Sequence, residues 1–351
     1  MINVRDQTNN VQIYMCWGFV LFLLIIAANI DEAKAMSKAI KNIELAPVNI
    51  KGVEGIQNIR LFETTEGILA FTSATGKLST ATNHQLIVSE NIIAPDFVQQ
   101  NTTLTINQLL AAHSAWDVNV TTNQSYAFVA EFAGGATNQL FYYNQDSQGT
   151  PFTDKYPFNS FSNPRFSRGG REGSQVEVSA ILDNEKLVVF PNLTNTKNAH
   201  YVEIGEWDSG VLLHAKQSYA VIAKRLHSGE SRHDVMPGVI ELFELDSQFK
   251  PKGAIISPVL ANTVYEYDAD ILFINDKFKY IIFSTGEDKP LLGVYDSNSN
   301  VYSEIMLSGQ FDKGNLTRPS ILVTTTHVYI AVIEARLTKN ARVLMGSLRL
   351  N

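Results

Sequence analysis

The sequence predicts an all-β protein assembled from repeated four-stranded units. After residue 56 the chain consists of short runs of Val, Ile, Leu, Phe and Tyr separated by Asn, Asp, Gly, Ser and Thr. This alternation is typical of short strands joined by polar turns, and no long stretch there has the period of a helix. One kind of apolar strand recurs along the chain, which indicates a repeat architecture.

The recurring strand has an apolar run that ends in a polar residue. Its copies are Gly67–Thr72, Tyr126–Glu131, Leu187–Asn192, Tyr219–Lys224, Tyr280–Thr285 and Tyr329–Glu334. The strands expected just before several of these copies are Trp116–Val120, Val176–Ile181, Val211–His214, Asp270–Ile274 and Pro319–Val323. In several units a third strand follows and ends in an Asp-Ser or Asn-rich turn, which suits a hairpin. Four antiparallel strands repeated about six times predict a six-bladed β-propeller, with five blades and a pair of β-sandwiches as the alternatives.

Residues 56–351 resemble the β-propeller superfamily, and within it the five- and six-bladed propellers of sialidases and arabinan-type glycosidases. Arg318-Pro319 is similar to the arginine-proline step that opens a sialidase propeller, although here it opens the final unit. The chain lacks the sialidase turn Ser-x-Asp-x-Gly-x-x-Trp/Thr and any recurring Trp-Asp pattern. The resemblance therefore implies a radial architecture and no specific family.

The ends of the chain predict how the ring closes. The last unit, from Pro319 to Asn351, supplies at most three strands. Lys41–Ile50 is therefore expected to add the missing outer strand, because closure removes exposed sheet edges. We assign residues 36–55 to this closing segment and 56–351 to the propeller domain. Lys77–Ala112 is expected to hold the outer strands of the first unit, with Thr105–His113 as a short helix.

Residues 1–35 predict an export signal. The segment from Val11 to Ala28 carries no charge, and its apolar block is shorter than the roughly 20 residues that span a bilayer. Ala33-Lys34-Ala35 provides a small-x-small cleavage site before Met36. The segment is therefore interpreted as a signal peptide, with an uncleaved N-terminal anchor as the alternative. In either case the rest of the chain is expected to be secreted or periplasmic, and a cleaved chain has no membrane span.

Composition limits the compartment and the partners. The formal net charge of -7 excludes nucleic acid and anionic membrane surfaces as the main partner. Cys16 is the only cysteine and lies in the export segment, so the mature chain forms no disulfide, which favours a bacterial periplasm or cell surface. The chain has no Walker loop, dinucleotide-binding glycine pattern, nucleophile elbow or zincin motif. We therefore expect neither a cofactor nor a metal site.

Polar residues at the strand ends are the candidate catalytic groups. In a propeller, the start of each innermost strand and the end of the next strand share one rim. The carboxylates expected on this rim are Asp117, Glu131, Glu177, Asp268, Asp270 and Glu334. Of these, Asp117, Glu131, Asp270 and Glu334 are the catalytic candidates. Glycoside cleavage needs two carboxylates about 5 to 9 Å apart, and the sequence does not select the pair. The alternative reading is that strands simply become polar where they leave the core.

Two basic segments are expected on the same rim, at residues 163–172 and 225–238. Arginine side chains there suit a carboxylate or phosphate, which they bind through two parallel hydrogen bonds. The candidate ligand-binding residues are Arg165, Arg168, Arg171, Lys224, Arg225, His227, Arg232, His233, Asp234 and Arg318. The alternative is that both segments are solvated loops of mixed charge.

Three functions remain open at this level. The preferred one is an exported propeller that binds a saccharide or another polar or anionic ligand at the central mouth. The second is a glycoside hydrolase or lyase that uses two rim carboxylates. The third is a non-catalytic surface protein that binds a protein partner through its outer faces. Whether the protein is an enzyme is left open by the sequence.

Overall fold

The structure is a computed structural model in which every described regular element is a β-strand. It describes residues 43–48, 56–64, 67–75, 85–93, 99–109, 116–120, 126–133, 138–144, 150–151, 160–168, 177–183, 186–191, 200–202, 209–214, 218–225, 238–256, 266–274, 277–285, 290–296, 301–312, 316–335 and 340–349. In these stretches no helix has the length and hydropathy needed to cross a membrane. The all-β prediction is confirmed, whereas the predicted export signal lies outside the described residues.

The described strands form six sheets. The first sheet contains β2 (Ile56–Thr64), β3 (Gly67–Thr75), β4 (Gln85–Ile93) and β5 (Gln99–Leu109). The second contains β6 (Trp116–Val120), β7 (Tyr126–Ala133), β8 (Asn138–Asn144) and β9 (Thr150–Pro151). The third contains β10 (Phe161–Phe166), β11 (Val178–Leu182), β12 (Lys186–Phe190) and β13 (His200–Val202). The fourth and fifth sheets are β14 (Ser209–His214), β15 (Ser218–Arg225), β16 (Gly238–Leu245) and β17 (Pro251–Ile256); and β18 (Glu266–Ile274), β19 (Lys277–Thr285), β20 (Leu291–Asp296) and β21 (Val301–Met306). The sixth sheet is β23 (Leu316–Val323), β24 (His327–Glu334), β25 (Arg342–Arg349), β1 (Glu44–Val48) and β22 (Ser308–Gly309).

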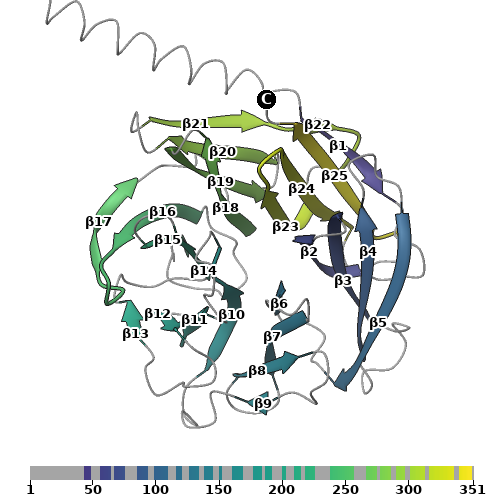
Figure 1. Ribbon diagram of the computed structural model, residues 1–351, viewed down its shortest axis with the longest axis horizontal. Coiled ribbons are helices and arrows are strands. Elements are labelled where there is room, and N and C mark those ends of the chain that lie inside the picture. The colour runs from purple at the N-terminus through teal and green to yellow at the C-terminus, as the bar shows by residue number, and fades with distance from the viewer. Residues whose placement is uncertain are drawn as a thin grey trace, which may run out of the picture.

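The sheets stand around a common centre, with their first strands innermost (Figure 1). The innermost strands touch one another in a closed cycle, from β2 to β6, β10, β14, β18, β23 and back to β2. In the first five sheets, strands that follow one another in the chain are antiparallel neighbours. In the sixth sheet, β1 pairs antiparallel with β25 and parallel with β22. This radial arrangement is that of a β-propeller. Side chains of the innermost strands that face the centre therefore come together from all around the ring.

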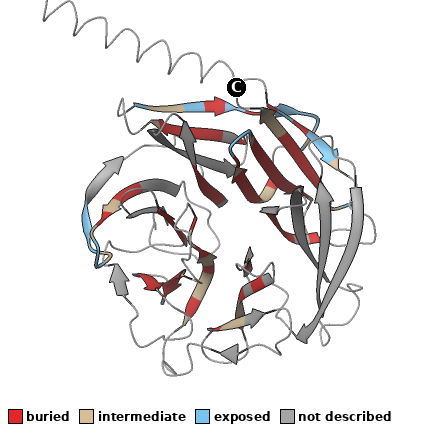
Figure 2. Cartoon of the chain, in the orientation of Figure 1, coloured by how far each residue is buried: buried red, intermediate tan, exposed pale blue. Residues whose placement is uncertain are grey.

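The hydrophobic core lies between facing sheets. Ala180 and Leu182 of β11 pack towards the second sheet, whereas Ile181 packs towards the fourth. This alternation follows from the two-residue period of a strand, which sends successive side chains to opposite faces. Phe161 and Phe190 lie in the interface of the second and third sheets, with ring centroids 6.0 Å apart. Figure 2 shows buried residues along the inner strands and exposed ones on the outer strands β1, β17 and β21.

Strand β1 lies in the sixth sheet, far along the chain from its neighbours. It pairs antiparallel with β25, where Ala46 is opposite Met345. It also pairs in parallel with β22, where Leu45 is opposite Gly309. Gly309 has a φ of 151°, and a Cβ there would lie 2.4 Å from the Leu45 carbonyl oxygen. The start of the described chain is thus held between two segments from its end.

Three predictions about local structure are wrong. Val176–Ile181 was expected to be the innermost strand of its unit, but β10 takes that place and β11 is the second strand. The basic segment expected as a loop from residue 163 begins inside β10. A helix was expected at Thr105–His113, but β5 extends through Leu109 as a strand. In the first two cases a bulge keeps Asn163 and Pro164 inside the innermost strand.

Candidate functional site

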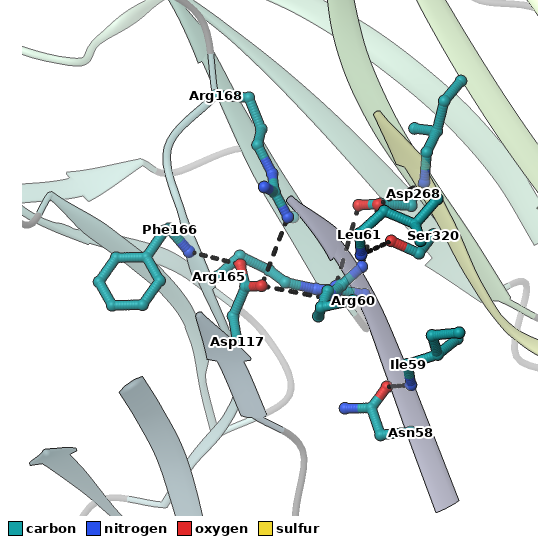
Figure 3. Close-up of polar contacts among 12 residues, drawn as sticks. Asn58, Ile59, Arg60, Leu61, Asp117, Arg165, Phe166, Arg168, Asp268 and Ser320 are labelled. Atoms are coloured by element: carbon teal, nitrogen blue, oxygen red, sulfur yellow. Dashed lines mark hydrogen bonds and ion pairs between the residues drawn. The ribbon is translucent and has the colours of Figure 1, made fainter. Parts of the chain in front are cut away.

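Charged side chains from four sheets meet at the centre of the ring. We call the set Arg60, Asp117, Arg165, Arg168, Asp268 and Asp270 the axial cluster. Figure 3 labels all of these residues except Asp270. Its members come from the innermost strands β2, β6 and β18 and from β10 with the residues just after it. The positions follow from the radial fold, because inward-facing side chains of these strands converge on one axis.

Arg60 connects the first sheet to two others. Its Nε lies 2.9 Å from Asp117 Oδ1, and its Nη1 lies 2.9 Å from Asp268 Oδ2. These contacts are ion pairs at hydrogen-bonding distance that lack the alignment of hydrogen bonds. The Arg60 side chain is only 2% exposed. A guanidinium removed from water in this way requires nearby negative charge, which the two aspartates supply.

Asp117 joins the second sheet to the first and third. Its Oδ1 accepts a hydrogen bond from Arg168 Nη2 at 3.3 Å and also meets Arg60. Its Oδ2 accepts a hydrogen bond from the Phe166 N–H at 2.9 Å. Asp117 is completely buried. Both of its carboxylate oxygens therefore have partners that hold neighbouring sheets together.

Two aspartates of β18 bind the neighbouring strand β23. Asp268 Oδ2 accepts the Ile321 N–H at 3.0 Å, and Asp270 Oδ2 accepts the Val323 N–H at 2.8 Å. Burial raises the pKa of Asp270 to about 6, although Arg168 and two backbone N–H groups act to lower it. Asp270 can therefore carry a proton near neutral pH, as the acid of a glycosidase must.

The innermost strands of the third and sixth sheets contain the same irregularity. In β10 the register shifts between Ser162 and Arg165, and in β23 it shifts between Thr317 and Ser320. Each shift contains a residue with positive φ followed by proline, namely Asn163-Pro164 with φ 50° and Arg318-Pro319 with φ 51°. Such β-bulges are common near active sites, where they redirect side chains.

An aspartate from the preceding sheet binds the strand just after each bulge. Asp117 accepts the Phe166 N–H, and Asp268 accepts the Ile321 N–H. Phe166 and Ile321 each stand two residues after the proline of their bulge. The contact between the second and third sheets is therefore of the same kind as the contact between the fifth and sixth. Arg60 forms ion pairs with both of these aspartates and so links the two aspartate–bulge contacts across the axis.

The axial cluster contains three arginines and three aspartates. Burial acts to lower the pKa of Arg168, but Asp117, Asp268 and Asp270 outweigh it, so that the pKa lies above its ordinary value. Arg165 is the most exposed cluster side chain, at 14%, and its Nη1 lies 3.9 Å from Asp268 Oδ1. In the part of the chain that the structure describes, Arg165 Nη1 and Arg168 Nε have no hydrogen-bond partner. Both nitrogens are buried and lack an acceptor among the described residues, so each is a candidate donor to a bound acceptor group.

The remaining sequence candidates lie elsewhere or outside the described residues. Glu131 is partly buried at the end of β7 and accepts the Asn163 N–H at 3.2 Å. Glu334 accepts the Asp312 N–H at 2.5 Å and a hydrogen bond from Arg342 Nε. Arg318 lies in the β23 bulge. Lys224 and Arg225 end β15, without described side chains, and Arg171, His227, Arg232, His233 and Asp234 are outside the described ranges.

Sequence reasoning did not single out Arg60. It placed Asp268 and Glu177 on the rim but outside the set of catalytic candidates. Arg60 is a charged residue between Ile59 and Leu61 in a buried strand, and this was the sequence signal for it. Glu177 joins the third and fourth sheets: its Oε1 accepts a hydrogen bond from Ser167 Oγ at 2.5 Å and contacts His214 Nε2. Among the described residues no group of three or more His, Cys, Asp or Glu side chains is arranged to hold a metal ion.

Comparison with solved structures supports the fold. The chain is similar to an α-L-arabinofuranosidase from Fusarium graminearum in complex with an iminosugar inhibitor, with a TM-score of 0.58, 7% identity and coverage of 88% of this chain and 97% of that one. It is similar to a sialidase from Trypanosoma rangeli, with a TM-score of 0.57, 11% identity and coverage of 88% of this chain and 58% of that one. A protein of unknown function from Dyadobacter fermentans matches with a TM-score of 0.55, 8% identity and coverage of 88% and 98%.

These likenesses show a shared β-propeller fold. This chain spans 58% of the sialidase chain, so the match leaves a large part of that protein uncovered. No protein-family model matches the chain, and no curated protein matches it either. The predicted propeller fold is thus supported, and no family is shown for this chain.

Proposed function

We propose that this protein is an exported six-bladed β-propeller that binds a polar or anionic saccharide at its axis. The observation that carries this proposal is the axial cluster, in which arginine donors without hydrogen-bond partners accompany buried carboxylates. Arg165 Nη1 and Arg168 Nε are the donors offered to a ligand carboxylate or hydroxyl. Carboxylate groups of the cluster would accept hydrogen bonds from the ligand's hydroxyl groups.

The saccharide class is taken from proteins with the same fold. The neighbours include a sialidase and an α-L-arabinofuranosidase, whose names refer to sugars. Convergence of charged groups at the axis fits such a ligand, because saccharides are held by a few well-placed polar groups. The six sheets that surround the axis would be the six blades. A non-catalytic protein-binding role remains the alternative if no saccharide binds.

Export is proposed from the sequence of residues 1–35. If the segment is a cleaved signal peptide, the mature chain begins at Met36 and is secreted or periplasmic. N-terminal sequencing of the chain recovered from outside the cytoplasm should then read Met36-Ser37-Lys38. Recovery of the chain with residues 1–35 attached to a membrane fraction would instead support the anchor.

Glycoside hydrolysis is the second candidate, and the raised pKa of Asp270 favours it. A hydrolase needs one carboxyl group that is protonated near neutral pH and one that is ionised. We propose Asp270 as the acid, since burial raises its pKa to about 6, and Glu131 as the second carboxylate. Asp117 and Glu334 suit this chemistry less well, because guanidinium groups pair with both of them: Arg60 and Arg168 with Asp117, and Arg342 with Glu334.

The binding proposal is tested on an array of neutral and acidic oligosaccharides. Arg165→Ala should weaken binding of an acidic saccharide by roughly tenfold or more, as expected for a hydrogen bond to a charged group. Lys252→Ala is the matched control, because it removes a positive charge from the outer strand β17, where Lys252 is 52% exposed. Absence of saccharide binding by the wild-type protein would overturn the proposal.

The same samples distinguish binding from hydrolysis. Release of reducing sugar by the wild-type protein, and its loss in both Asp270→Asn and Glu131→Gln, would support the second candidate. Binding without release would support the first candidate. Release that persists in both variants would exclude these two carboxylates as the acid and its partner.

A further inference from the structure

Arg60 occupies the centre of the axial cluster, where two of its guanidinium nitrogens form ion pairs with aspartates. Its guanidinium uses two different nitrogens for two aspartates on different sheets, Asp117 and Asp268, each at 2.9 Å. With 2% of its side chain exposed, it is the largest fully buried side chain of the described residues. Its location suggests an effect on the other arginines, transmitted through the aspartates.

We infer that Arg60 is a positioning residue that neutralises Asp117 and Asp268, so that Arg165 and Arg168 remain available to the anionic group of a ligand. This inference rests on the proposed saccharide-binding function and assigns to Arg60 the control of selectivity for charged over neutral saccharides. Arg60 itself need not touch the ligand.

The charge balance of the cluster carries this inference. With Arg60 present, three arginines face three aspartates; without it, two arginines face three aspartates. Asp268 would then have lost its nearest cation, and Arg165 Nη1, now 3.9 Å from Asp268 Oδ1, is the next one available. A buried carboxylate without a partner is strongly unfavourable. Arg165 would therefore turn from the ligand to Asp268.

Arg168 would be affected through Asp117. Arg60 and Arg168 now share Asp117 Oδ1, at 2.9 Å and 3.3 Å. Removal of Arg60 leaves Arg168 as the only described cation in contact with that carboxylate, so its guanidinium should be held there more strongly. The ligand would thus lose two donors through removal of a third residue that does not contact it.

Arginine suits this position better than lysine. The two aspartates are met by Nε and Nη1, which are separate atoms of one planar group. A lysine has a single nitrogen, so it can restore the charge but cannot meet both carboxylates in the same geometry. Arg60→Lys should accordingly recover only part of the selectivity lost in Arg60→Ala.

The test measures binding of methyl glucuronide and sialyllactose, each beside its methyl ester, which has the same shape without the charge. In Arg60→Ala, affinity for the acids should fall tenfold or more while affinity for the esters changes less than twofold. Millimolar guanidinium chloride should restore much of the difference by occupying the vacated position. Equal loss for acids and esters would mean a general structural role and would overturn the inference.

A second variant covers the case in which Arg60→Ala does not fold. Arg60→Met combined with Asp268→Asn removes one charge of each sign, so the axial cluster stays balanced. Arg165 then has no orphaned carboxylate to pair with, and preference for the acids over their esters should return towards the wild-type value. Persistent loss of that preference in a folded double variant would overturn the inference.

A structure of the Arg60 variant separates this inference from the proposed function. Arg165 Nη1 and Asp268 Oδ1 should move from 3.9 Å to hydrogen-bonding distance, about 2.8 Å. This change is expected even if the wild-type protein binds no saccharide, an outcome that would overturn only the proposed function. An unchanged Arg165 in the variant would overturn the positioning role whatever the ligand.

Discussion

Replacement of Asp117 should reveal how strongly the axial cluster holds the fold together. The carboxylate is fully buried, and three groups from other sheets bind it: Arg60, Arg168 and the Phe166 N–H. Asp117→Asn keeps an oxygen for the Phe166 N–H but removes the charge that the two guanidinium groups face. Asp117→Ala removes both.

The expected magnitudes follow from these contacts. Loss of one partner from a buried ion pair costs about 3–5 kcal/mol, because it leaves a charge without compensation. Asp117→Asn should therefore lower the free energy of unfolding by about 3–5 kcal/mol. Asp117→Ala should lower it by about 1–3 kcal/mol more, because the Phe166 N–H then also lacks an acceptor. The total approaches the whole stability of an ordinary domain, about 5–15 kcal/mol.

The assay is equilibrium unfolding in urea, followed by tryptophan fluorescence and circular dichroism. The matched control is Glu44→Gln, which removes a negative charge from an exposed position on β1 and should stay within about 0.5 kcal/mol of the wild type. The reasoning is refuted if Asp117→Asn also stays within about 1 kcal/mol. Such a result would mean that Arg60 and Arg168 find sufficient compensation without Asp117.

Two further predictions concern pH and ring closure. Because burial raises the pKa of Asp270 from 3.8 to about 6, the folded chain retains a proton that the unfolded chain loses, and stability should fall by about 3 kcal/mol as pH rises through this window. Urea unfolding at a series of pH values should show this fall in the wild type relative to Asp270→Asn; a constant difference would contradict it. Gly309→Ala should lower thermal stability by about 1–3 kcal/mol, because its φ is 151° and its Cβ would lie 2.4 Å from the Leu45 carbonyl. In Gly293→Ala the new Cβ would meet the Tyr302 side chain, so the loss of stability should be smaller. An equal or smaller loss in Gly309→Ala would show that the contact between β1 and β22 tolerates a side chain.

The repeated hairpins were predictable because strand signals are local. An apolar run with period two, such as Tyr329–Glu334, is readable without knowledge of its neighbours, and the structure places it in β24. The unit containing β10 was read one strand out of place because Asn163-Pro164 resembles a loop. A proline normally marks the limit of a strand. Here a bulge keeps it inside the innermost strand, and a carboxylate from another sheet binds the backbone two residues later.

The axial cluster was only partly predictable, because it forms between distant segments. Asp117 and Asp270 were selected from their positions at the starts of strands, and Arg165 and Arg168 as members of a basic segment; the structure brings all four together at the axis. Arg60 was not selected, since a single arginine in an apolar strand has no meaning until its partners are known. Those partners lie on the second and fifth sheets, and only closure of the ring places them on both sides of Arg60.

The position of β1 has a consequence for how the chain reaches its final state. A ribosome delivers residues 44–48 early, yet their hydrogen-bonding strands, residues 308–309 and 342–349, are made near the end of synthesis. One bond across this gap, from Ser308 to the Ile43 carbonyl, joins residues 265 positions apart. Contacts at such separation form late, because a very long loop must be closed first. The final sheet must therefore be completed after nearly all of the polypeptide has emerged, and an incomplete chain would leave β1 without its partner strands and open to unintended pairing.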